Sequence, residues 1–376
     1  MDATASKKAL EGLRVFVKAL VKSRVKDKES WRRWRKKEGT EAFMEKCFGY
    51  ERTGKMPSIT GLVAPFFHPE LPLIGINYSH VAHNVLHAFH DGWTPALRLC
   101  RGIVFDRKGV LTAKPFEKFF NYGEHAETKD LPDLPFVATT KHDGHLGIIF
   151  RYDGKLVLTT RGSFESRSSV LGIGLLAKRK TWTKMFPEGM TVLCEIIHRD
   201  TRVHVDYGRK SGFILIGAYD NATLADLDQT ALVALGKRFK VEVTEVWQGS
   251  SIEELRAFMA DLSVRNLEGF VVRFANGLRV KFKFASYINL MVEDKLGYTY
   301  LMNRMIGGTL EKMNGNLQEE VLDEAREMVR KIEAVKTVEG DEKARRAYLY
   351  ALDAEKKDNQ YYRGICRKYL KHVAAA

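Results

Sequence analysis

The residues best suited to chemistry lie at positions 140–146, which read Thr-Lys-His-Asp-Gly-His-Leu. Lys141 is followed, after one residue, by Asp143 and Gly144, and an apolar run begins at Leu146. That run is β-branched and aromatic, which predicts a strand, so the lysine lies where a loop enters a sheet. Gly144 leaves room for a large group to approach the backbone. An amine in this place could act as a nucleophile, although the spacing by itself also fits a solvent-exposed lysine.

A second cluster lies on a predicted hairpin. Asn276-Gly277 between two β-forming runs is a strong hairpin signal, and a two-residue loop there sets Lys281 opposite Val272. Side chains alternate across a strand, so we expect Glu268, Lys281 and Lys283 to share one face. One carboxylate and two lysines on one face suit the binding of a charged substrate. The alternative is a solvent-exposed hairpin with a surface salt bridge.

Two further charged residues lie on predicted strands of the same region. An Asp-Gly turn at 153–154 pairs its flanking strands so that Arg161 comes level with Leu146, beside the Lys141 loop. Glu195 lies in the middle of an apolar strand, where a carboxylate is costly unless it is paired, hydrogen-bonded or bound to a metal. Upstream, Arg101 heads the strand Arg-Gly-Ile-Val-Phe-Asp, and Lys118 lies among aromatics in Pro-Phe-Glu-Lys-Phe-Phe-Asn.

The composition narrows the class of protein. The chain has 376 residues, a net charge of +14 and a pI near 9.4, which favours a polyanionic partner such as nucleic acid. A soluble protein that is merely basic is the alternative. The four cysteines lie far apart, which argues for a reducing compartment and against a zinc site. With no long apolar run and no signal-peptide pattern, we expect a cytoplasmic protein.

The first 55 residues form a separate block that holds 16 Lys/Arg against 8 Asp/Glu. An apolar stripe at three/four spacing predicts an amphipathic helix there: Leu10, Leu13, Val17, Leu20 and Val21. Residues 31–37, Trp-Arg-Arg-Trp-Arg-Lys-Lys, interleave aromatics with cations. Two interpretations fit and are compatible: a phosphate-binding surface with stacking side chains, and a helix whose tryptophans face the core while the cations face water.

The pattern of predicted elements indicates an α+β fold with antiparallel sheets. The predicted strands are 99–105, 146–152, 155–160, 192–197, 212–218 and 270–284. Helical patterns lie near 172–185 and 252–263, and a helical stripe in the tail consists of Val321, Ala325, Met328, Ile332 and Val335. Residues 344–357 are rich in helix formers. We therefore expect a basic, mainly helical extension at 1–70, an α+β domain at 71–288 and an all-helical domain at 289–376.

The order of these stretches resembles that of the covalent nucleotidyltransferases, which include ATP-dependent ligases and mRNA capping enzymes. It is most similar to ATP-dependent RNA ligases of the bacteriophage T4 tRNA-repair type. There, an Arg-Gly-Ile-like stretch and Lys-Phe-Phe-Asn precede the nucleophile, as residues 101–103 and 118–121 do here. The resemblance runs from about residue 74 to 287 and implies an ATP-grasp-like adenylyltransferase domain. The family commonly has Ser or Thr where this chain has His145.

The resemblance also implies a role for each position. Lys141 would attack the α-phosphorus of ATP and carry a lysyl-AMP. Lys281 and Lys283 would contact the α-phosphate, and as neighbouring ammonium groups they would disfavour the charged form of Lys141. Glu195 would bind the AMP ribose, and Glu268 would support the catalytic metal ion.

The remaining positions complete the expected nucleotide site. Arg101 and Lys118 would grip the triphosphate, and Arg161 would contact phosphate. Phe120 and Gly144 belong to the same nucleotide-binding set, because they lie within the motifs that contain Lys118 and Lys141. Asp143 would support the loop through hydrogen bonds rather than act as a base. The site residues expected from sequence are thus Arg101, Lys118, Phe120, Lys141, Asp143, Gly144, Arg161, Glu195, Glu268, Lys281 and Lys283.

The implied function is ATP-dependent joining of RNA 5′-phosphate and 3′-hydroxyl ends through a lysyl-AMP and an RNA-adenylate. ATP and Mg²⁺ are the implied cofactors, with Mn²⁺ as a substitute. RNA, tRNA included, is the expected partner of a monomer that binds no membrane. One alternative is a DNA ligase or capping-type enzyme, in which an OB barrel usually follows the last lysine motif; the other is a catalytically inactive RNA-binding relative.

Overall fold

In the computed structural model the described residues are 3–86, 92–260, 266–287, 330 and 333–354. The chain forms two compact units, one of Met1–Ser251 with Leu267–Lys283 and one of Ile252–Asn266 with Phe284–Ala376. The three-part division expected from sequence stays a prediction. Its first boundary, at residue 70, falls between two paired strands of the larger unit.

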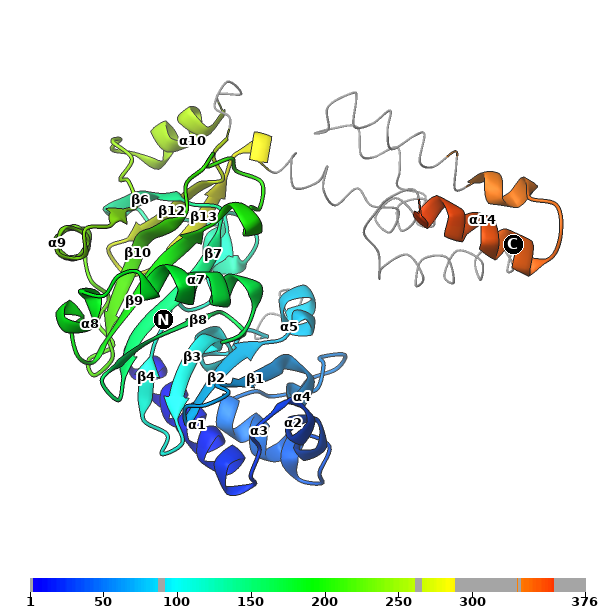
Figure 1. The fold of residues 1–376 in the computed structure, drawn as a ribbon, viewed down its shortest axis with the longest axis horizontal. Coiled ribbons are helices and arrows are strands. Elements are labelled where there is room, and N and C mark those ends of the chain that lie inside the picture. Colours follow the sequence, from blue (N-terminus) through cyan, green and yellow to red (C-terminus); the bar gives the residue numbers. More distant parts are fainter. Residues whose placement is uncertain (1–2, 87–91, 261–265, 288–329, 331–332, 355–376) are drawn as a thin grey trace. The chain divides into compact units, whose positions relative to one another are not determined.

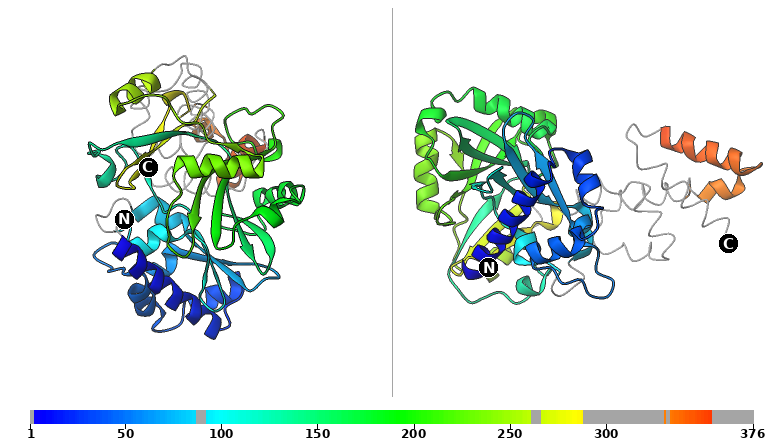
Figure 2. Two further views of the ribbon diagram at one scale, coloured as in Figure 1. Left: turned by 90° about the vertical axis from the view of Figure 1, so that its left-hand side faces the viewer. Right: turned by 90° about the horizontal axis from the view of Figure 1, so that it is seen from below.

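Four helices open the larger unit: α1 (Ala3–Lys22), α2 (Lys28–Trp34), α3 (Thr40–Phe48) and α4 (Ile59–Leu62). The apolar stripe predicted for α1 is confirmed, because Leu10, Leu13, Val17 and Leu20 are buried and Val21 packs against the same core. In Figure 1 and in the left view of Figure 2 these blue helices lie against the cyan strands of the first sheet. Burial of each such side chain contributes about 1.5–3 kcal/mol, which fixes the helices to the sheet.

The two tryptophans of α2 face this core. Trp31 and Trp34 are 5% and 7% exposed and pack on Phe16, whereas Arg32 and Arg33 between them are exposed. Positions three apart share one face of a helix, so the cations fall on the other side. The interpretation of the tryptophans as stacking side chains for nucleic acid is therefore wrong. The alternative, core-facing tryptophans beneath solvent-facing cations, is confirmed.

The first sheet is antiparallel and has the order β1-β2-β3-β4. Its strands are β1 (Val63–Phe67), β2 (Leu73–Tyr78), β3 (Arg101–Asp106) and β4 (Leu111–Ala113), and α5 (His80–Val85) and α6 (Pro95–Leu99) lie between β2 and β3. Alternate residues of β3 serve two cores: Ile103 and Phe105 pack with the N-terminal helices, and Val104 packs with the second sheet. The first sheet is thus the middle of a layered unit.

The second sheet has the order β11-β10-β9-β7-β8. Its strands are β7 (His145–Tyr152), β8 (Lys155–Thr160), β9 (Met190–Ile197), β10 (Gly212–Asp220) and β11 (Glu242–Val243), and the β10–β11 pair is parallel. The predicted register of the β7–β8 hairpin is confirmed, with Tyr152 opposite Lys155. Asp153 and Gly154 both have positive φ, +49° and +71°, the conformation that an Asp-Gly hairpin turn requires. Arg161 therefore follows β8 beside the start of β7.

Helices α7 (Arg167–Ala177), α8 (Trp182–Met185) and α9 (Gln229–Phe239) cover the other face of this sheet, as Figure 1 shows. Ile149 of β7 packs in the core beneath them, and its neighbours Ile148 and Phe150 pack toward the first sheet. Two short 3₁₀ helices, η2 (Ala126–Thr128) and η3 (Arg199–Thr201), follow β5 and β9. The expected α+β class with mainly antiparallel sheets is confirmed.

The third sheet has the order β5-β13-β12-β6. Its strands are β5 (Phe120–Asn121), β6 (Phe136–Lys141), β12 (Gly269–Phe274) and β13 (Arg279–Lys283), with β5 parallel to β13. The hairpin predicted at Asn276-Gly277 exists, but its register is wrong by one residue: Lys281 pairs with Val271, not with Val272. The loop has three residues, closed by a hydrogen bond from the Gly277 N–H to the Phe274 carbonyl, because Gly277 supplies a left-handed position at φ +85°.

The smaller unit contributes α10 (Ile252–Ala260), η5 (Ala334–Thr337) and α14 (Glu342–Ala354) to the described residues. The helices predicted near 252–263 and 344–357 are confirmed by α10 and, as far as Ala354, by α14. Of the predicted apolar stripe in the tail, Val335 is buried in η5, and the other four residues lie outside the described ranges. In the described part of the chain no helix is both long and apolar enough to cross a membrane.

Candidate active site

A cavity of about 640 Å³ lies where side chains from all three sheets of the larger unit meet. Its wall includes Asn77 and Arg101 from the first sheet, Leu146 and Glu195 from the second, Arg161 just after β8, and Thr140, Lys141, Val271 and Lys281 from the third. Four lining residues are Lys or Arg and one is acidic, counted among the residues that the structure describes. A sheltered cavity with this excess of positive charge attracts an anion.

Lys141, the last residue of β6, is held by a buried carboxylate. Its Nζ lies 2.5 Å from Oε2 of Glu268, and Nζ of Lys283 lies 2.9 Å from Oε1 of the same side chain. Glu268 is 4% exposed. A buried charge needs such partners, so one carboxylate bridges two lysines that come from different strands.

Glu268 reaches this place because Gly269 interrupts the alternation of the strand. In the observed register Lys283 lies opposite Gly269, so a regular strand would send Glu268 to the other face. Gly269 has a φ of +151°, which residues with a Cβ rarely adopt, and a Cβ there would lie 1.9 Å from the Phe282 carbonyl oxygen. The cluster expected from strand alternation therefore forms, but through a twist at glycine.

The loop after Lys141 is held by hydrogen bonds from a distant segment. Oδ2 of Asp143 accepts from the backbone N–H groups of His204 and Val205, each at 2.8 Å. The N–H of Asp143 donates to the hydroxyl of Tyr207 at 2.8 Å. This is the geometry of a supporting residue, as expected for Asp143. It fixes the backbone direction from which the Lys141 side chain leaves β6.

Glu195 also holds the loop that follows Lys141. Its Oε1 accepts a hydrogen bond from the N–H of Gly144 at 3.1 Å. Burial raises the pKa of Glu195 from 4.5 to about 7, and the charge of Glu268 acts in the same direction, whereas Lys141 opposes both. A Cβ at Gly144 would lie 2.5 Å from the Ile196 carbonyl oxygen, so the glycine permits this close approach.

This raised pKa predicts a pH-dependent stability. The folded chain binds the Glu195 proton more tightly than the unfolded chain, so the contribution of Glu195 is complete below pH 4.5 and is lost as the pH rises through about 7. As the pH rises from 4.5 to about 7 and above, wild type should lose up to about 3 kcal/mol of unfolding free energy relative to the variant Glu195→Gln. The glutamine of that variant does not titrate, so it serves as the reference. Urea unfolding of both proteins at several pH values measures the difference. Parallel pH profiles would contradict the assignment.

Arg101 and Arg161 form the cationic rim of the cavity. Arg161 donates to the hydroxyl of Tyr78 at 3.2 Å and its guanidinium stacks on the Tyr78 ring. Arg101 lies over the ring of Phe119, and one of its buried guanidinium nitrogens has no hydrogen-bond partner among the described residues. A buried, unsatisfied N–H donor that faces a cavity suits an anionic ligand.

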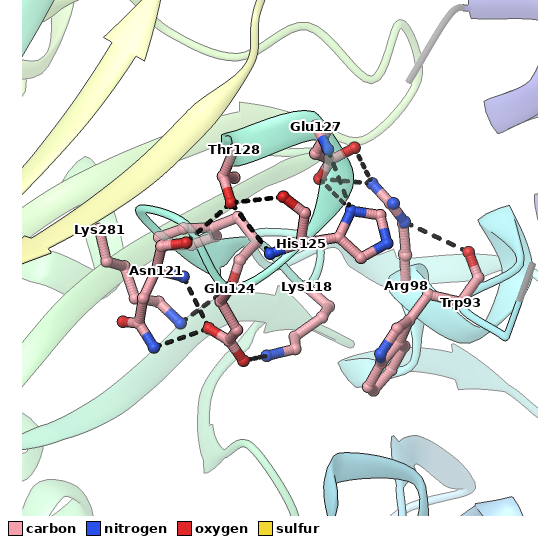
Figure 3. Close-up of polar contacts among 10 residues, drawn as sticks. Trp93, Arg98, Lys118, Asn121, Glu124, His125, Glu127, Thr128 and Lys281 are labelled. Atoms are coloured by element: carbon pink, nitrogen blue, oxygen red, sulfur yellow. Dashed lines mark hydrogen bonds and ion pairs between the residues drawn. The ribbon is translucent and has the colours of Figure 1, made fainter. Parts of the chain in front are cut away.

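Lys281 and Lys118 are joined by the segment shown in Figure 3. Nζ of Lys281 donates to the carbonyl of Phe119 at 2.9 Å, and Nζ of Lys118 lies 3.8 Å from Oε1 of Glu124. The other oxygen of Glu124 accepts from the N–H and the side-chain amide of Asn121, at 2.7 and 2.6 Å. Burial lowers the pKa of Lys281 well below its ordinary value, and the charge of Lys118 adds to this effect. The segment therefore concentrates positive charge behind the cavity.

Five expected site residues are not among those that line the cavity. Asp143, Glu268 and Lys283 belong to the contacts around Lys141 described above, and the other two are Phe120 and Lys118. Phe120 is fully buried, stacks on His125 and packs in the core of the N-terminal helices. Its neighbour Phe119 lines the cavity instead. Lys118 is 5% exposed, and its ammonium group lies over the Phe120 ring. The alternation of the short strand β5 decides which phenylalanine faces inward, and the sequence Phe-Phe does not.

Sequence reasoning missed several residues of the site. Tyr207 and Tyr78 hold the Lys141 loop and Arg161, and neither stands in a motif that would identify it. His142 also lines the cavity; burial and the charge of Lys210 lower its pKa to about 4, so its imidazole is neutral. The only local sequence signal for Tyr207 is that it follows the apolar pair Val203 and Val205. This pattern fits an ordinary strand equally well.

Comparison with known proteins identifies the family to which this chain belongs. A family model described as RNA ligase matches residues 99–287, half of the chain. The chain belongs to the RNA ligase family. The matched span contains Lys141, Glu268 and Lys283 and all the cavity-lining residues except Asn77 and His80. The T4-type resemblance inferred from the motifs is thereby confirmed.

The individual relatives of this RNA ligase family member have low sequence identity with it. A protein from Thermovibrio ammonificans, provisionally named an RNA ligase, is 30% identical over 190 residues, which cover 48% of each chain. The chain thus spans about half the length of this curated relative. Among solved structures, an RNA ligase of Naegleria gruberi with pyrophosphate is 18% identical, covering 41% of this chain and 50% of that one at a TM-score of 0.34. An archaeal ATP-dependent RNA ligase is 14% identical, covering 82% and 92% at a TM-score of 0.49.

Proposed function

We propose that this chain is an ATP-dependent RNA ligase that joins 5′-phosphate and 3′-hydroxyl ends through a covalent lysyl-AMP. The observation that carries the proposal is the Glu268 bridge, which places the amine of Lys141 at the wall of a cationic cavity. Membership of the RNA ligase family supports RNA as the substrate. A DNA ligase or an inactive RNA-binding relative has no comparable support.

Activation of Lys141 needs a proton acceptor, because an ammonium group cannot attack phosphorus. Oε2 of Glu268, at 2.5 Å, is placed to take that proton. Lys283 stays on Oε1 and balances the negative charge of the carboxylate until the transfer occurs. The charge of Lys141 also helps to lower the pKa of Lys281.

The adenylylation step then follows from the positions of the cations. The amine of Lys141 forms a bond to the α-phosphorus of ATP, and the bond from that phosphorus to the β-phosphate oxygen breaks, releasing pyrophosphate. Arg101, Arg161 and Lys281 line the same cavity and would neutralise the phosphate charge as it builds. Glu195, opposite them, is suited to a hydrogen bond from the ribose hydroxyls.

Two transfers complete the reaction. An oxygen of the RNA 5′-phosphate attacks the phosphorus of lysyl-AMP, and the bond to Lys141 breaks, giving an RNA-adenylate. The 3′-hydroxyl of a second end attacks the 5′-phosphate of that adenylate, and AMP leaves as the new phosphodiester forms. Both steps use the same cationic wall, because each passes through a crowded phosphate transition state.

A divalent cation fits this site only together with phosphate. Within the described residues no group of three or more His, Cys, Asp or Glu side chains could hold a metal ion, and both oxygens of Glu268 are paired with lysines. Mg²⁺, with Mn²⁺ as a substitute, would bind substrate phosphate oxygens, which is the mode that Mg²⁺ commonly uses, and Glu268 would join them only through an oxygen that its lysine partner has left. When bound, it would supply positive charge at the phosphates.

Labelled ATP tests the proposal. Incubation of the full chain with ATP, Mg²⁺ and an α-³²P label should leave radioactivity on the protein after denaturing electrophoresis, whereas a γ-³²P label should leave none. A 5′-phosphorylated RNA should then remove the α label as RNA-adenylate and joined product, and a 5′-hydroxyl RNA should not. Protein that takes no α label even after treatment with pyrophosphate, which strips bound AMP, would refute the proposal.

A further inference from the structure

The helix α2 and its flanking turns concentrate the positive charge of the chain. Residues 22–37 hold nine Lys/Arg and two Asp/Glu, a net charge of +7, half of the +14 of the whole protein. We call the exposed cations of this segment the α2 cationic surface: Lys22, Arg24, Lys26, Lys28, Arg32, Arg33, Lys36 and Lys37. The mechanism proposed for the cavity uses none of them.

The α2 cationic surface is mounted on a fixed scaffold. Trp31 and Trp34 anchor α2 in the core, and Nε1 of Trp34 donates to Oγ of Ser23 at 2.9 Å, which ties the helix to the end of α1. Asp27 caps the helix by accepting from the N–H of Ser30 at 2.7 Å. The cations are therefore held in place before any partner binds, unlike the cations of a flexible basic tail.

The acidic residues of the segment are already engaged. Asp27 serves as the helix cap, and Glu29 is paired with Arg33 one turn along α2. In the part of the chain that the structure describes, Arg33 is the one member of the α2 cationic surface that forms an ion pair. Most of its charge is thus uncompensated and available to a polyanion.

Hydrogen bonds connect the segment that carries the α2 cationic surface to the wall of the cavity. Arg35 donates to the carbonyl of Thr60 in α4, and the next residue of α4, Gly61, accepts from the hydroxyl of Ser79 at 2.7 Å. His80, which follows Ser79, and Asn77, two residues before it, line the cavity. An RNA whose end lies in the cavity could therefore continue over the N-terminal helices.

We propose that the α2 cationic surface binds the phosphate backbone of the RNA whose end enters the cavity. The inference rests on the proposed function and adds a second contact region for the same substrate. Because both tryptophans are buried, this region offers charge without stacking, so binding there should not depend on base sequence and should weaken steeply with salt. RNA is the substrate proposed for the cavity, and its backbone carries regularly spaced negative charges that this surface can bind.

Charge removal on the full chain tests the proposal. The variant Lys28→Gln/Lys36→Gln/Lys37→Gln removes three exposed cations, and Lys155→Gln/Lys184→Gln/Lys237→Gln removes three exposed lysines scattered over β8, α8 and α9. Fluorescence anisotropy with a short 5′-hydroxyl single-stranded RNA, without ATP, gives the affinity over a range of salt. The first variant should bind about 100-fold more weakly near 0.1 M salt, with a salt slope shallower by about 2, and the second should bind like wild type.

Each result separates this inference from the proposed function. Lysyl-AMP formation without RNA should be equal in wild type and both variants, because no substituted residue lines the cavity. An equal loss of RNA affinity in both variants would overturn the inference, since total charge would then explain the binding. Unchanged RNA affinity in the first variant would also overturn it, and loss of binding to phosphatidylserine vesicles in that case would assign the surface to a membrane instead.

Discussion

Replacing Lys141 with alanine is expected to abolish labelling of the protein by α-³²P ATP. The substitution removes the amine that would form the bond to phosphorus. The neighbouring ammonium groups are committed elsewhere, that of Lys281 to the carbonyl of Phe119 and that of Lys283 to Glu268. The fold should persist, because Lys283 still neutralises the buried carboxylate. Denaturing electrophoresis measures the label, and circular dichroism checks the fold.

A matched control for this loss is Lys210→Ala. Lys210 is a lysine of the adjacent segment that is paired with Glu242 and is not among the residues lining the cavity. It should leave labelling unchanged. Digestion of labelled wild type should place AMP on the peptide that contains Lys141 and on no other. Retention of label by Lys141→Ala would mean that a different side chain is the nucleophile.

Replacing Gly269 with alanine should damage both stability and activity. A Cβ at this position would meet the Phe282 carbonyl oxygen at 1.9 Å, and the backbone has a φ of +151°. Strain of this kind costs on the order of 1–3 kcal/mol for the dihedral alone, and relief of the contact must displace β12 from β13. Lysyl-AMP formation should fall steeply, because Glu268, the preceding residue, would lose its place between Lys141 and Lys283.

Gly277→Ala provides the control for Gly269→Ala. Gly277 lies in the loop of the same hairpin at a φ of +85°, but a Cβ there would meet no atom within 4 Å. Only the left-handed strain remains, about 1–2 kcal/mol, and the active-site carboxylate is untouched. Thermal unfolding should therefore rank wild type above Gly277→Ala and both above Gly269→Ala. If the two variants melt together and label equally, the close contact at Gly269 does not control the site.

Features that depend on neighbouring residues could be predicted from the sequence alone. The apolar stripe of α1 places its buried face, and the Asp-Gly turn at 153–154 sets the register of β7 with β8. The Lys-x-Asp-Gly stretch made Lys141 the candidate nucleophile because the glycine and the strand that follows lie beside it. Local periodicity and turn chemistry carry enough information for these features, since their geometry is complete within a few residues.

Features that depend on contacts between distant segments could be seen only in the folded chain. Whether Trp31 and Trp34 face nucleic acid or the core depends on Phe16 of another helix. The hydroxyl of Tyr207 meets the Lys141 loop from 64 residues away. Glu268 reaches Lys141 through one twist at Gly269, and a loop one residue longer than expected shifts the hairpin that carries Lys281 and Lys283. A shift of one residue exchanges the faces of a strand, and only the packed sheet determines which face meets the cavity.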